Sequence, residues 1–147
     1  MASREQILDA LLALLAATGE FKLVSRRDRA PETIGPALSP AVFLLENPVR
    51  AEKYERPSPS SPPIRTLYVD AVFYNDAGAD PNVIPLTIVN DALDALDAAL
   101  KPDSPMTGRL TLGGLVYSVM REGDARKSDG AKTGRAVAIA PIAIILP

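Results

Sequence analysis

The segment at residues 64–76, IRTLYVDAVFYND, constrains the fold more than any other part of the chain. Its side chains alternate along its whole length. Leu67, Val69, Ala71 and Phe73 fall on one face, which is almost uniformly apolar, whereas the other face mixes apolar and polar side chains. A period of two is typical of a β-strand with one buried face. We therefore expect a long strand whose apolar face covers the hydrophobic core.

Two other segments predict amphipathic helices. Ser3 followed by Gln6 is a capping box, and Ile and Leu then recur at helical spacing until Gly19, so a helix should end near Thr18. Residues 77–101 carry a second apolar stripe, with Asp80–Pro81 as a possible N-cap and first helical position. Pro85 leaves the start of this helix open, because a helix interior tolerates proline badly.

The remaining apolar runs indicate strands at residues 21–29, 41–47, 108–124 and 134–147. The polar segment 123–134 joins the last two, which predicts an antiparallel hairpin with a flexible tip. The proline-rich segment 50–63 predicts a projecting loop, because prolines cannot donate to a β-ladder. Within it SPSSPP, residues 58–63, has a ligand for a proline-binding module as its alternative, and the loop is favoured. We expect one α+β domain over residues 1–147, with projecting loops near 50–63 and 123–134. Its single, mostly antiparallel sheet has about four to five strands, with two helices packed on one face.

Composition limits the chemistry that this fold can carry. The 147 residues include no Cys and no His, which removes disulfides, thiolate catalysis, Cys-based zinc sites and the commonest general base. The net charge of −2 provides no positive field for nucleic acid or anionic lipid. No apolar run reaches the roughly 20 residues that span a bilayer. We therefore predict no catalytic residue, no cofactor and no metal site; an enzyme using Asp, Lys or Tyr has no motif behind it.

Two groups of charged residues are candidates for binding. Arg26, Arg27 and Arg29 either grip phosphate or pair with acidic groups on a neighbouring subunit. No aromatic or Gly-rich nucleic-acid motif accompanies them, which favours an interface or solvent exposure.

The second group is acidic: Asp91, Asp94 and Asp97 recur at every third position. They form either a carboxylate stripe for a divalent cation or a solvated helix face, with Lys101 placed to pair with Asp97. The solvated face is favoured, because oxygen-ligand sites usually wrap a loop around the ion.

Gly113 and Gly114, in TLGGLV, raise the question of a phosphate-binding loop. The segment lacks the Lys-Ser/Thr of a P-loop and the spacing of a dinucleotide site, and it precedes a predicted strand where phosphate motifs precede a helix. The pair is better explained as a turn or bulge that bends the chain into the final hairpin, or as a place where another backbone comes close.

The segment TLGGLVYSVMREGD, followed by GRAVAIAPIAIILP, resembles the tail-terminator (tail-completion, minor tail) proteins of long-tailed bacteriophages. The similarity extends over most of the chain. It includes the opening helix, FKLVSRRDR, SPAVFLLEN, a strand of the LYVDAVFY kind and the helix IVNDALDALDAAL. The SPSSPP stretch departs from the family's pattern.

The resemblance implies a structural virion protein without bond chemistry. Such proteins form a ring, usually a hexamer, on the head-proximal end of the tail tube, where they stop tube polymerisation and offer a docking surface for the head. The implied partners are copies of the chain itself, the tail tube protein and a head-completion (stopper) protein, with no sequence-specific nucleic acid and no membrane. The implied location is the tail–neck junction of the virion, after synthesis in the host bacterial cytoplasm. The alternatives are a head-completion or stopper ring of the neck, a tail-tube-like subunit, or a small cytosolic binding module outside the virion.

A ring needs complementary surfaces on each subunit. Arg26, Arg27 and Arg29 on one copy and Asp91, Asp94 and Asp97 on the next are our candidate pair of opposite charge. The basic residues of the 123–134 tip are candidates for meeting a ring neighbour or the tube: Arg126, Lys127 and Lys132. We expect the 50–63 and 123–134 segments to become ordered on meeting the tube or the head connector.

Overall fold

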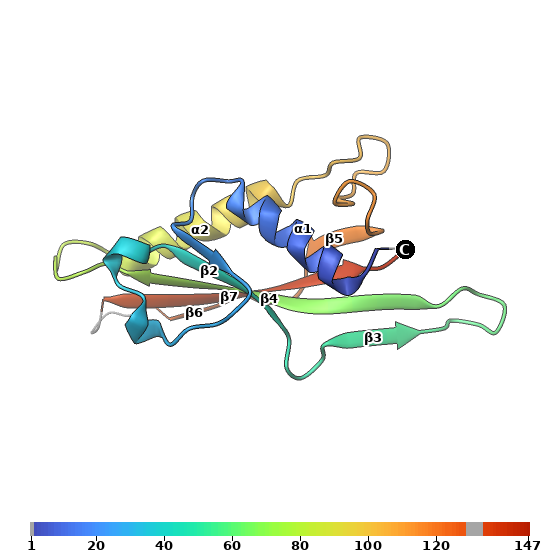
Figure 1. Cartoon of the computed structure of the whole chain (residues 1–147), viewed down its shortest axis with the longest axis horizontal. Helices are drawn as coiled ribbons and strands as arrows, with labels where there is room; N and C mark the ends of the chain where they lie inside the picture. Colours follow the sequence, from blue (N-terminus) through green and yellow to red (C-terminus); the bar gives the residue numbers. More distant parts are fainter. Residues whose placement is uncertain (1, 129–133) are drawn as a thin grey trace.

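The computed structural model describes residues 2–128 and 134–147. Within them the chain forms an α+β fold, with a mixed sheet of seven strands and two α-helices on one of its faces (Figure 1). Two short 3-10 turns, Pro31–Thr33 and Pro36–Leu38, precede the second strand. The elements follow in the order α1 (Arg4–Ala16), β1 (Leu23–Ser25), β2 (Ala41–Glu46), β3 (Glu52–Glu55), β4 (Ile64–Asp76), α2 (Pro85–Ala99), β5 (Ser118–Arg121), β6 (Arg126–Ser128) and β7 (Arg135–Ile145).

The two longest strands form the centre of the sheet. β4 and β7 run antiparallel, in register from Thr66↔Ile145 to Asp76↔Arg135. Two shorter strands, β2 and β3, pair one after the other along the outer side of β4, and β5 and β6 do the same along β7. At one edge β1 pairs with β2 in the parallel sense. The sheet is therefore larger than expected and is partly parallel.

The helix-facing core confirms the alternation predicted for residues 64–76. β4 has the predicted bounds, and Leu67, Val69, Ala71 and Phe73 are all buried. The Ser3–Gln6 capping box is present, and α1 begins directly after it. Both helices bury one stripe each against this face, made of Ile7, Leu8, Leu11, Leu15, Val89, Ala92, Leu93 and Leu96.

Two segments expected as loops contain strands. The 50–63 segment includes β3, and the 123–134 segment includes β6. Both strands are polar and exposed, so their side chains carry no apolar pattern. They form because the backbone along the outer sides of β4 and β7 offers free hydrogen-bonding groups. The prolines of the first segment begin only at Pro57, after β3 has ended.

Three predicted elements are shorter than expected. The 21–29 strand is reduced to Leu23–Ser25, and the 108–124 strand to Ser118–Arg121. The second helix begins at Pro85 instead of Asp80–Pro81, because proline at the first helical position sacrifices no N–H bond. Asp80 instead accepts a hydrogen bond from the backbone N–H of Asn82 (2.9 Å) in the preceding loop.

Pro141 lies inside β7 and divides the strand beside it. The Pro141 carbonyl accepts a hydrogen bond from the Glu122 N–H (3.0 Å), so its carbonyl faces the β5/β6 side. The N and C=O of one strand residue point the same way in an antiparallel ladder, so the missing N–H of Pro141 faces that side too. The outer strand breaks there: β5 pairs with residues 142–145 and β6 with residues 137–139.

The face of the sheet without helices carries a second, smaller core. Ile34, from the segment with the 3-10 turns, packs there on Phe43 and Val72. Further along this face, the Arg50 guanidinium lies over the Tyr68 ring, 4.0 Å from its centroid, and its Nη2 lies 3.3 Å from Oε2 of Glu122. These contacts connect the β2–β3 turn to the end of β5.

Candidate functional site

The arginine cluster is divided by the fold. Arg26 packs against α1, where its Nη1 lies 2.5 Å from Glu5 and 3.4 Å from Asp9. The hydrogen bond from Arg26 lowers the pKa of Glu5 below its usual value. Arg27 and Arg29 are exposed and form no ion pair with another described residue. Arg26 is therefore occupied within the subunit, and only Arg27 and Arg29 offer charge to a partner.

The aspartate stripe is divided in the same way. Asp97 accepts two hydrogen bonds from Nη1 of Arg121 on β5, at 2.9 and 3.1 Å, and does not pair with Lys101 as the sequence suggested. Lys101 lies beyond the end of α2, so it is not one helical turn above Asp97. Asp91 and Asp94 remain exposed, and together with Glu20 they line an acidic groove of about 500 Å³ between the end of α1 and α2.

Of the basic residues predicted at the 123–134 tip, two lie in β6. Arg126 and Lys127 are exposed, and Lys127 donates a hydrogen bond from Nζ to Oδ1 of Asn90 on α2 (2.7 Å). Lys132 lies outside the described residues. Lys127 shares a groove of about 480 Å³ with Arg121, Asp94 and Asp97. The fold thus brings part of the acidic stripe beside basic residues of the same subunit.

Gly113 and Gly114 lie in a turn. Both have positive φ, at 70° and 94°, and follow Leu112, whose φ is also positive at 51°. The Asp103 carboxylate accepts hydrogen bonds from the backbone N–H groups of Thr111 (2.7 Å) and Gly113 (3.0 Å), and these bonds lower the pKa of Asp103. A Cβ added at either glycine would meet no atom of the described residues within 4 Å, so no other described backbone comes close there. The left-handed turn, and not crowding, is what requires glycine.

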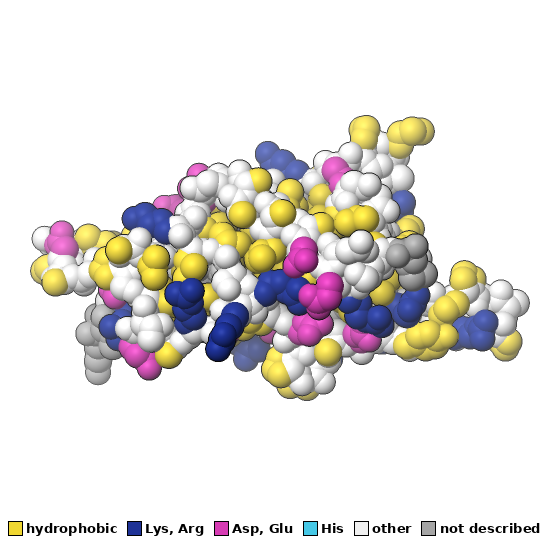
Figure 2. Space-filling model, in the orientation of Figure 1, with side chains coloured by type: hydrophobic (Ala, Val, Ile, Leu, Met, Phe, Trp, Pro, Cys, Tyr) yellow, Lys and Arg dark blue, Asp and Glu magenta, His cyan; other side chains and the backbone are white. Residues whose placement is uncertain are grey.

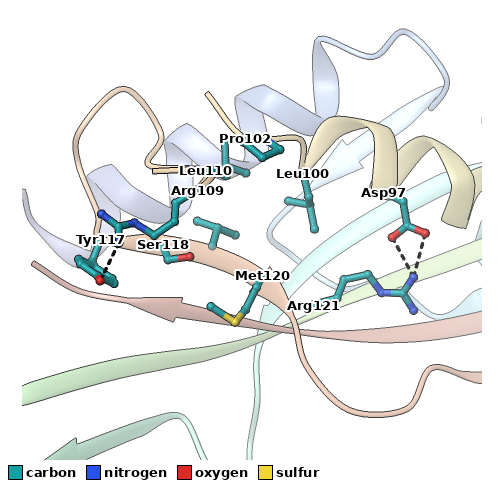
Figure 3. Close-up of a pocket in the computed structure, with 11 residues that line it drawn as sticks. Asp97, Leu100, Pro102, Arg109, Leu110, Tyr117, Ser118, Met120 and Arg121 are labelled. Carbon is teal, nitrogen blue, oxygen red and sulfur yellow. Dashed lines mark hydrogen bonds and ion pairs between the residues drawn. The ribbon is translucent and has the colours of Figure 1, made fainter. Parts of the chain in front are cut away.

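This turn creates a groove that sequence reasoning missed. It folds the chain back so that Leu110 bridges to Val119 beside β5, and a groove of about 460 Å³ opens between this segment and the end of α2 (Figure 3). We name it the α2–β5 groove and define it by Leu100, Pro102, Arg109, Tyr117, Met120 and Arg121. The glycine pair was the available signal, because a reversal there places residue 110 beside residue 119.

The α2–β5 groove has an apolar floor and a charged group at each side (Figure 3). At one side the Arg109 guanidinium stacks on Tyr117, 3.9 Å from the ring centroid, and donates to its hydroxyl at 2.7 Å. The Arg109 Nε is buried and has no hydrogen-bond partner among the described residues. At the other side lies the Asp97–Arg121 ion pair. Two guanidinium groups against one carboxylate give this groove a net positive charge.

Charges of both signs are interspersed on the face of the molecule where α1 lies (Figure 2). They include the Arg26–Glu5 contact and an ion pair between Arg4 and Glu52 on β3. The charges in these two contacts are paired within the chain.

A comparison with models of known protein families finds no match, and neither does a comparison with curated proteins. Within residues 2–128 and 134–147, no three His, Cys, Asp or Glu side chains are grouped so as to hold a metal ion. No helix in that part of the chain is long and apolar enough to cross a membrane.

Proposed function

We propose that this chain is a structural subunit of a ring that caps the head-proximal end of a bacteriophage tail tube. The ring, a hexamer in proteins of the kind that the sequence resembles, ends tube polymerisation and provides the surface on which the head is joined. Its action is binding and geometric closure.

The observation that carries this proposal is the order in which the resembling segments fold. The opening helix is α1, AVFLLE is β2, LYVDAVFY lies within β4, IVNDALDALDAA lies within α2, and the chain closes with the hairpin of β5, β6 and β7. Most segments that carry the resemblance thus contribute an element to one continuous sheet or a helix on it, whereas FKLVSRRDR keeps only Leu23–Ser25 as a strand and TLGGLV forms a turn. Agreement between independent segments is stronger support than any single motif.

The exposed charges supply a second support. Arg27 and Arg29 follow the edge strand β1, whereas Asp91 and Asp94 lie on the solvent side of α2. Neither pair is neutralised by an ion pair within the described chain. Separate surfaces of opposite sign on one subunit are what a head-to-tail ring requires.

Electron microscopy of particles made without this protein tests the proposal. We expect overlong tails that are not joined to heads, and normal length restored when the wild-type chain is supplied again. Tails of normal length beside filled, unjoined heads would instead identify a stopper of the neck. Normal, joined particles would contradict any role at the tail–neck junction and favour a binding module outside the virion.

A further inference from the structure

The fold places two exposed apolar surfaces at opposite ends of the sheet. The loop at residues 77–84 follows Asp76, at the end of β4. The α2 helix then returns along the sheet, so that β5 lies beside Ile145, which pairs with Thr66 near the start of β4. Figure 1 shows the 77–84 loop at one end of the molecule and the segment between α2 and β5 at the other. The two surfaces cannot meet within one copy.

The first surface is the α2–β5 groove. Tyr117 and Met120 at its rim are 49% and 43% exposed, so two large side chains with apolar surface border the apolar floor and are open to a partner. Among the residues that the structure describes, the Arg109 guanidinium hydrogen-bonds only to a neutral group, the Tyr117 hydroxyl. An incoming carboxylate offers Arg109 a charged acceptor, and hydrogen bonds to charged groups are about twice as strong as neutral ones.

The second surface is the 77–84 loop itself. Ile84 is 64% exposed and Val83 is 36% exposed. Asp80 is also exposed and forms no ion pair with any other residue that the structure describes. The loop therefore combines apolar side chains with one uncompensated negative charge, which complements an apolar groove of net positive charge.

We propose that the 77–84 loop of one copy docks into the α2–β5 groove of the next copy. Ile84 and Val83 lie against the rim at Tyr117 and Met120, and the Asp80 carboxylate pairs with Arg109. The inference rests on the proposed ring, because it names one contact between its subunits beside the charge pairing proposed above. Such a contact is heterologous, and repeated around an axis it closes a ring.

The small number of residues in the loop limits the strength of the contact. The 77–84 loop contributes eight residues, whereas a standard interface takes roughly 20–30 residues from each side. Each pairwise contact is therefore weak. Closing a ring makes the last contact intramolecular, which raises its effective concentration. Association should thus be steep in protein concentration, or be driven by a tail tube that gathers the copies.

Cysteine cross-linking tests the contact directly, because the chain contains no Cys. The purified Ile84→Cys, Met120→Cys double variant, oxidised at high concentration, should give a ladder of covalent oligomers that ends in one closed species. Each single variant should give at most a dimer. The matched control is Ile84→Cys with Tyr54→Cys, since Tyr54 is also 64% exposed but lies on β3, outside the groove; it should give at least tenfold less cross-linked product.

Charge exchange tests the Asp80–Arg109 pair. In the double-cysteine background, Asp80→Arg and Arg109→Asp should each lower the yield of oligomers at least tenfold, and the two together should restore it. Asp80→Asn keeps an oxygen that can accept from Asn82 and removes only the charge, so it should also lower the yield even if Arg109→Asp fails to fold. Equal yields in all these variants would overturn the pairing.

The outcomes separate this inference from the proposed function. A lack of cross-links between positions 84 and 120 of the double variant, both in purified protein and in lysates containing assembled tails, overturns the inference; cross-links only to a different protein do the same. If the chain still caps tails in that case, the proposed function stands. A covalent ring that fails to cap tails supports the inference and contradicts the function.

Discussion

The carboxylate of Asp103 accepts a hydrogen bond from the backbone N–H of Gly113 at 3.0 Å, and this bond is the largest cause of the lowered pKa of Asp103. A second bond comes from the N–H of Thr111. Together they hold the 111–114 turn that brings Leu110 beside β5.

This relationship predicts a pH dependence of the turn. A carboxyl whose pKa is lower in the folded protein than in the unfolded chain stabilises the fold at every pH above its unfolded pKa. This contribution is lost as the pH falls through the folded pKa. In an NMR titration, the chemical shift of the Gly113 amide should therefore change at a pH below the range in which carboxyl groups usually titrate. Asp103→Asn should remove that titration, whereas the exposed control Asp124→Asn should leave it unchanged. A Gly113 signal that still titrates in Asp103→Asn would contradict the assignment.

We expect a substitution at Gly114 to destabilise the fold only through the backbone conformation. An added Cβ has open space, but φ is +94°, so Gly114→Ala should lower the free energy of unfolding by about 1–2 kcal/mol. The matched control is Gly35→Ala, where the space is also open but φ is −80°. There alanine should raise the free energy of unfolding by about 0.4–1 kcal/mol, because it restricts the unfolded chain. Urea unfolding measures both; equal effects at the two sites would refute the argument.

We expect the largest loss of stability when the Phe73 side chain is truncated. Its side chain is 1% exposed and its ring lies 5.7 Å from that of Phe21. Phe73→Ala leaves a cavity between the sheet and the helices and should lower the free energy of unfolding by about 3–5 kcal/mol. Tyr54→Ala, at an exposed site on β3, should change it by less than about 0.5 kcal/mol. Thermal unfolding compares the two, and a loss at Phe73 no greater than that at Tyr54 would show that this core is misplaced.

We expect charge reversal to affect assembly at Arg27 and the fold of the subunit at Arg26. Arg27→Asp should leave the free energy of unfolding unchanged and weaken ring formation at low salt, because Arg27 is free of ion pairs with described residues. Arg26→Asp should instead separate α1 from the segment after β1, by placing a like charge beside Glu5 and Asp9. Lys22→Asp is the exposed control. Sedimentation at several salt concentrations measures ring formation, and intact rings in Arg27→Asp at low salt would exclude Arg27 from the interface.

The sequence predicted what is local. The face of Phe73 and the capping box at Ser3 were correct because alternation and capping depend on near neighbours. β3 was missed because it forms by pairing with the backbone groups along the outer side of β4, and its own residues carry no strand pattern. The predicted pairing of Asp97 with Lys101 was wrong. Asp97 instead pairs with Arg121, which β5 places beside α2, and local spacing in the sequence cannot reveal that contact. The α2–β5 groove was missed because it requires the Leu110–Val119 bridge, and the glycine pair indicated a bend without indicating which residues the bend brings together.

The break at Pro141 bears on how such a subunit avoids uncontrolled growth. A long unbroken sheet edge is a template on which further chains can add without limit. Here the strand outside β7 is two short pieces of four and three residues. Along that margin the described residues leave no continuous row of main-chain donors and acceptors on which a fibre could begin. Contacts between copies along this margin are thereby left to side chains, which can specify an angle and hence a finite assembly.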